Sequence, residues 1–160
     1  MGQSVTIACQ WSLTSFSEFF AILSGVTGAH LSVVDEQLQL VESEAHWRLV
    51  LYQLSDEPLS AAEEYSSNED IDQRFLQDLA DLRFYIVRFN QFEVARQLLR
   101  LVCASAVARR ERLWIDTDYG CVIHSADFLQ RLEADPAWDW RTLTPWYNAM
   151  SAPEDGDIDD

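Results

Sequence analysis

The feature that most constrains the fold is a period-two alternation of apolar and polar side chains that recurs along residues 30–54. Alternation indicates strands, because successive side chains of a strand point to opposite faces of a sheet. It predicts strands at 30–34, 37–42 and 46–54. The connections between these strands are too short for crossover helices, so we expect neighbouring strands to pair antiparallel.

The rest of the chain mixes further strands with amphipathic helices. Apolar residues also alternate at the start of the chain, from Val5 to Trp11, and strand character returns later. Spacings of three and four residues between apolar side chains instead indicate helices that bury one face. The further strands are expected at 83–89, 113–116 and 121–124, and the helices at 15–25, 71–82 and 126–134. A further, central helix is expected to follow Asn90 and to end near residues 109–112.

Three helix starts carry side chains that can accept hydrogen bonds from open backbone N–H groups. Ser15 with Glu18 and Asn90 with Glu93 have the spacing of a capping box, and Ser125 precedes the last helix. We therefore expect Ser15, Asn90 and Ser125 to cap their helices.

These elements predict an α+β fold with a mostly antiparallel sheet of about five to seven strands packed against three or four helices. A chain of 160 residues with 48% apolar residues can bury the core of one domain. We expect residues 1–150 to form that domain and residues 151–160 to be an acidic, disordered tail.

The charge is strongly and unevenly negative. There are 27 acidic residues against 11 basic ones, all arginine, for a net charge of −16. The net charge is −10 over residues 1–70, +3 over 71–112 and −9 over 113–160. Such a chain repels nucleic-acid phosphate and anionic lipid and attracts basic proteins, so we expect no nucleic-acid and no membrane partner. We also expect the central arginines to form internal ion pairs.

The cysteine and histidine residues indicate neither a disulfide framework nor a cofactor. Cys9, Cys103 and Cys121 are odd in number and lack CxxC spacing, and no secretory signal is visible, so a reducing cytoplasm is expected. His30, His46 and His124 have no spacing typical of metal ligands. We expect no metal and no cofactor. The oligomeric state is not determined by the sequence.

Two segments combine acidic residues with tyrosine. Residues 55–70 carry six acidic residues and no basic one, and residues 116–120 have the pattern of a hairpin turn. Carboxylates speed the encounter with a basic protein and aromatic side chains anchor it, so both segments are candidates for an interface. The predicted partner-binding residues are Glu63, Glu64, Tyr65, Glu69, Asp70, Asp116, Asp118 and Tyr119.

Other interpretations of the same residues remain open. Asp116 and Asp118 are paired carboxylates after an apolar strand and could serve a small metal-dependent hydrolase, or they could simply accept hydrogen bonds from turn amides. The charge also suits an acidic nucleic-acid mimic that inhibits a DNA-binding protein. Such a mimic should space its acidic residues along one face, whereas here they cluster in predicted loops.

The sequences LWIDTDYGCVIH of residues 113–124 and PAWDW of residues 136–140 resemble the C-terminal part of bacterial immunity proteins from polymorphic-toxin and contact-dependent or type VI secretion systems. The resemblance covers residues 113–140, 28 of 160. It implies a non-enzymatic, cytoplasmic antitoxin that binds and neutralises one cognate toxin domain, and the acidic residues given above would then occlude the active site of that toxin. It supplies neither the chemistry of the toxin nor the interface positions.

Overall fold

A computed structural model describes residues 3–42, 47–54, 71–117 and 121–142. They form an α+β fold built on one seven-stranded sheet in which every pairing is antiparallel. The strand order is β2-β3-β4-β5-β1-β6-β7. The strands are β1 (Gln3–Cys9), β2 (His30–Val34), β3 (Gln37–Glu42), β4 (Trp47–Gln53), β5 (Arg83–Phe89), β6 (Leu113–Asp116) and β7 (Val122–His124).

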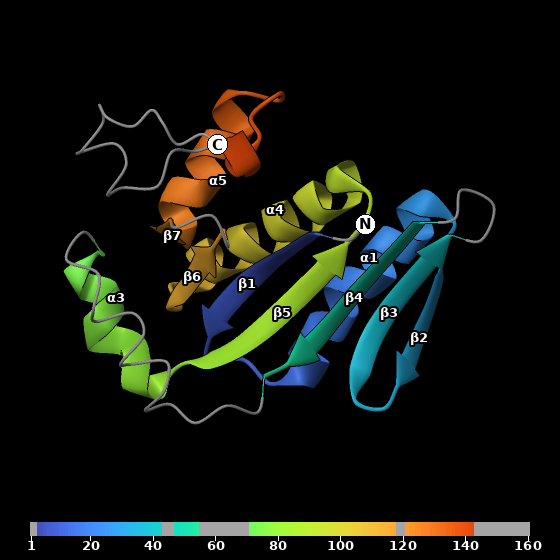
Figure 1. The fold of residues 1–160 in the computed structure, drawn as a ribbon, viewed down its shortest axis with the longest axis horizontal. Helices are drawn as coiled ribbons and strands as arrows, with labels where there is room; N and C mark the ends of the chain where they lie inside the picture. Colours follow the sequence, from blue (N-terminus) through green and yellow to red (C-terminus); the bar gives the residue numbers. More distant parts are fainter. Residues whose placement is uncertain (1–2, 43–46, 55–70, 118–120, 143–160) are drawn as a thin grey trace, which may run out of the picture.

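Four α-helices and three 3-10 helices accompany the sheet in the described residues. Two of them, α1 and α4, lie together on one face of the sheet, and α3 lies apart from them beside β6 (Figure 1). The predicted fold class is therefore confirmed. The helices are η1 (Leu13–Phe16), α1 (Ser17–Thr27), α3 (Gln73–Asp78), η2 (Leu79–Asp81), α4 (Phe92–Arg109), α5 (Ser125–Ala134) and η3 (Trp140–Thr142).

The alternation of apolar and polar side chains in the sequence corresponds to the two faces of the sheet. Strands β2 and β3 have the predicted bounds, and β4 ends one residue earlier than predicted, whereas the predicted first residue, His46, lies outside the described residues. In β4, Trp47, Leu49 and Leu51 are buried, whereas Arg48 between them is exposed. The alternate side chains of each strand thus separate a helix-covered inner face from an outer face.

The main core fills the space between the inner face and the helices α1, α4 and α5. Ile7, Leu49 and Val87 come from three different strands and are completely buried there against helical residues such as Phe20 and Leu99. A smaller cluster lies on the outer face, where α3 and its flanks cover β1, β6 and β7. Its buried members are Ala8, Ile71, Phe75, Leu79, Leu82, Trp114 and Val122.

The predicted caps are wrong. Helix α1 begins at Ser17 after a 3-10 turn that contains Ser15, and no side chain caps it. The Asn90 side chain instead accepts a hydrogen bond from the backbone N–H of Arg48 at 2.8 Å, so it joins β4 to the end of β5. At α5 the capping acceptor is His124 Nδ1, which accepts from the N–H of Ala126 at 3.1 Å.

Ser125, predicted to be the cap of α5, is its first residue. Its hydroxyl is buried without a hydrogen-bond partner. A distant contact thus replaces the expected cap at Asn90, whereas at α5 the neighbouring His124 takes the capping role.

Candidate protein-interaction surface

Of the eight predicted partner-binding residues, the structure describes Asp116. It ends β6, is half-buried, and pairs in register with Thr6 of β1 and Val122 of β7. This register places Asp116 on the outer face. The other seven residues, Glu63, Glu64, Tyr65, Glu69, Asp70, Asp118 and Tyr119, lie outside the described residues.

The base of the predicted hairpin is held by two hydrogen bonds. The backbone N–H of Thr117 donates to the carbonyl of Cys121 at 2.9 Å, and its hydroxyl donates to the same carbonyl at 3.3 Å. Both residues are buried. These bonds join the described residues on either side of positions 118–120.

The two predicted acidic segments border the same corner of the fold. Ile71, which directly follows Asp70, and Val122, which follows the hairpin, are both buried in the small outer cluster with Trp114. The structure therefore brings together the two residues that border these segments, although Ile71 and Val122 are 51 residues apart in sequence.

Three of the described carboxylates at this corner are paired with arginines. Arg112 contacts Asp78 at 3.0 Å and Asp81 at 3.3 Å, and Arg74 contacts Asp72 at 2.8 Å. The hydrogen bond from Arg74 lowers the pKa of Asp72. The predicted internal ion pairs of the central segment are thus confirmed, and these acids are already neutralised within the chain.

His124 lies at the same corner. Its ring packs edge-on against the Trp114 ring, with 4.9 Å between the centroids. Burial, and secondarily the charge of Arg74, lower the pKa of His124 below its ordinary value. The neutral ring is also the form that can accept the capping hydrogen bond at Nδ1, so the geometry and the pKa shift agree.

The charge of the chain separates between the described body and the remaining segments. The described residues hold all 11 arginines and 14 acidic residues, a net charge of −3. The other 13 acidic residues lie in segments 43–46, 55–70, 118–120 and 143–160, which contain no basic residue. Most of the surplus negative charge therefore belongs to the segments that include the predicted interface.

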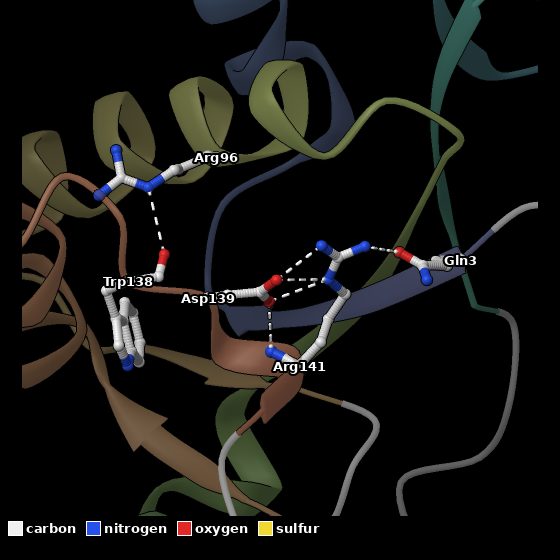
Figure 2. Close-up of polar contacts among 5 residues, drawn as sticks. All are labelled: Gln3, Arg96, Trp138, Asp139 and Arg141. Carbon is white, nitrogen blue, oxygen red and sulfur yellow. Dashed lines mark hydrogen bonds and ion pairs between the residues drawn. The ribbon is translucent and has the colours of Figure 1, made fainter.

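The residues that carry the family resemblance near its end have structural roles. Trp140 is completely buried in the main core, where its ring contacts Phe92 and Phe128. Arg141 forms an ion pair with Asp139 and reaches Gln3 of β1 at 2.6 Å, as Figure 2 shows. The guanidinium of Arg141 also lowers the pKa of Asp139.

Arg96 of α4 is a structural residue that the sequence analysis missed. It is 8% exposed, and its guanidinium donates to the carbonyls of Leu132 and Asp135 at 2.9 Å each. A longer hydrogen bond, at 3.4 Å, goes to the carbonyl of Trp138 and is drawn in Figure 2. An arginine on an amphipathic helix is ordinarily a surface residue, so no pattern in the sequence distinguished it. It joins α4 to the C-terminal end of α5 and the segment that follows.

Two buried thiols, those of Cys9 and Cys103, have raised pKa values. Burial raises the pKa of Cys9 to about 12 and also raises that of Cys103, so neither provides a thiolate near neutral pH. Within the described ranges, no group of three or more His, Cys, Asp or Glu side chains could hold a metal ion. Asp118 lies outside these ranges, so the pair with Asp116 remains untested.

A groove of about 620 Å³ lies between α1, α4 and α5 and was not predicted. Ile22 and Val26 of α1 form one wall and are 47% and 71% exposed. Arg96 and Arg100 of α4 line it as well. Its charges are mixed, because Glu93 and Glu133 lie along the same groove.

Comparisons with known proteins add no relative. A scan against protein-family models found no match, and searches of curated proteins and of solved structures found none either. In the portion of the chain that is described, no helix has both the length and the apolar character to cross a membrane.

Proposed function

We propose that this chain is an immunity protein, which binds a cognate bacterial toxin domain in the cytoplasm and occludes its active site with an acidic surface. The observation that carries the proposal is the separation of charge. The described body holds every arginine at a net charge of −3, whereas 13 acidic residues lie in segments without a basic residue. The resemblance of residues 113–140 to immunity proteins supports the same conclusion.

The interface would combine the acidic residues of 55–70 with the hairpin that follows Asp116. Their bordering residues, Ile71 and Val122, share one buried cluster, so both segments extend from one corner of a rigid sheet. Charge pairs between such carboxylates and the Lys or Arg of a toxin cleft typically couple by about 1.5–7 kcal/mol. Tyr65 and Tyr119 would add buried anchor area at the same place.

The proposed mechanism needs no chemical step on this chain. The negative potential speeds the encounter with a basic cleft, and the paired surfaces then exclude the toxin's substrate. Because an exposed electrostatic interaction is screened by salt, association should slow as the salt concentration rises.

The test begins in the native host. We expect deletion of the gene to be lethal only while the neighbouring gene, the candidate toxin, is intact. Survival of the single deletion, in cells where the neighbouring gene is expressed, would refute the role as an immunity protein.

The interface is tested with matched charge reversals and the purified neighbouring protein. Glu63→Arg with Glu64→Arg should slow association and flatten its salt dependence. Asp157→Arg with Asp159→Arg changes the net charge by the same amount at a different place, and it should leave both nearly unchanged. Equal effects in the two pairs would show that only the overall charge matters and would refute this interface.

A further inference from the structure

Strand β2 forms one edge of the sheet and is unusually open. Among the described strands it pairs with β3 alone. Val33 and Val34 are 67% and 43% exposed, and they are two of the five large apolar side chains exposed in the described residues. The edge strands of natural sheets are commonly protected by charged residues or proline. Residues 30–34 contain no lysine, arginine, aspartate, glutamate or proline.

The register shows which backbone groups face outward. The two-residue turn Asp35–Glu36 joins β2 to β3, and Val34 pairs with Gln37 across it. In a hairpin of this type the residues that flank the turn exchange backbone hydrogen bonds, and the exchange recurs at every second pair. The N–H and C=O groups of Leu31 and Val33 therefore point away from β3, toward a further strand.

A second copy of β2 fits this edge in antiparallel orientation. With the twofold axis at Ser32, Leu31 of the first copy lies opposite Val33 of the second, and Val33 of the first copy lies opposite Leu31 of the second. These are the four residues whose backbone groups face outward, so two outward pairs form together. The same register places apolar side chains opposite apolar ones, as stable cross-strand pairs require.

The polar groups at the ends of the strand also suit this arrangement, because an imidazole N–H can donate to a carboxylate. His30 is exposed at one end of β2, and Asp35 and Glu36 follow the other end. Antiparallel pairing brings the histidine of each copy toward the acidic turn of the other. The strand itself is uncharged, so two copies of a chain with net charge −16 can meet here with little local repulsion.

The opposite edge of the sheet does not offer the same surface. Strand β7 has only three residues, two of them buried, and leads directly into α5. We therefore propose that this chain forms a homodimer in which two β2 strands pair antiparallel and extend the sheet across both copies. This surface is separate from the proposed toxin interface, so either proposal can fail without the other.

The test measures the mass of the full chain in solution. Pairing through one short strand is at the low end of interface sizes, so the chain is loaded at about 0.2 mM in sedimentation equilibrium. We expect a mass about twice 18.4 kDa for the wild type. Val33→Lys places a charge on the edge, and Val33→Pro removes the outward N–H while sparing those that face β3; both should give the monomer mass.

The matched control is Val26→Lys. Val26 is 71% exposed on α1, so this variant makes the same substitution with the same change of net charge away from the edge, and it should remain a dimer. Thermal unfolding confirms that each variant is folded. A monomeric wild type overturns the proposal and leaves the edge for a strand of another protein. A folded dimeric Val33→Lys, or a monomeric Val26→Lys, overturns it as well.

Discussion

Replacing Arg96 by methionine should destabilise the protein strongly, because its guanidinium is buried against the end of α5. The two hydrogen bonds of Arg96 at 2.9 Å go to the carbonyls of Leu132 and Asp135, at the C-terminal end of α5. Helix ends leave carbonyl groups without partners and carry partial negative charge, so a cation placed there is favourable. Methionine keeps most of the side-chain volume but provides no donor.

The expected magnitude follows from these contacts. A hydrogen bond with a charged donor contributes about 1.5–3 kcal/mol, so the two short contacts together contribute about 3–6 kcal/mol. The third contact, at 3.4 Å, is too long to add much. Removing the guanidinium from water costs several kcal/mol, which the methionine variant recovers in part. We therefore expect Arg96→Met to lower the free energy of unfolding by about 3 kcal/mol.

Urea unfolding followed by tryptophan fluorescence measures this change. Arg100→Met is the control, because Arg100 lies one turn further along α4 and is exposed; it should change the free energy of unfolding by less than about 0.5 kcal/mol. Arg96→Lys keeps the charge but not the planar fork and should fall between the two. An Arg96→Met variant as stable as the control would refute the bracing role of Arg96.

Three further predictions concern other contacts. The pKa of His124 is lower in the folded chain than in the unfolded one, so the unfolded chain binds the proton first. The free energy of unfolding should therefore fall as the pH drops from about 7 toward 5. His124→Asn keeps a capping acceptor and should flatten this fall in urea titrations at several pH values. Asp78→Ala should lower the free energy of unfolding by about 1–3 kcal/mol, because it leaves the buried indole N–H of Trp114 without its acceptor at 3.0 Å. Asp81→Ala removes only an exposed ion pair and should lower the free energy of unfolding by under about 1 kcal/mol. Equal losses for the two variants in chemical denaturation would contradict this prediction. Glu36→Gly should raise the free energy of unfolding by about 1 kcal/mol, because Glu36 has φ 62°, a conformation that glycine adopts without strain. A lower urea midpoint for this variant would show that another contact of Glu36 dominates.

The sequence predicted the elements well where local periodicity determines them. Strands 30–34, 37–42 and 83–89 have the expected bounds, and α4 ends at Arg109, within the cluster of residues 109–112 near which its end was expected. Alternate burial along a strand and an apolar stripe along a helix are visible in the sequence itself. The fold class followed from the same patterns. The candidate interface did not gain comparable support, since Asp116 is the one predicted site residue that the structure describes.

The features that the sequence could not predict depend on distant contacts. Asn90 has the local signature of a cap, yet its side chain binds the backbone of Arg48, 42 residues away. Arg96 has no local signature, and its importance comes from carbonyls 36 to 42 residues further along the chain. The order of the strands is likewise set by which faces can be buried together, and not by the spacing of residues within each strand.

The central place of β1 in the sheet has a consequence for synthesis on the ribosome. Strands β2, β3 and β4 follow one another and can associate soon after they emerge. The partners of β1 are β5 and β6, which end at Phe89 and Asp116, so the earliest described strand must wait for most of the chain to be translated. Such long-range pairing slows folding and leaves an apolar strand exposed meanwhile. During that interval Val5 and Ile7 are available to chaperones and to other nascent chains, and expression at lower temperature should therefore improve the yield of folded protein.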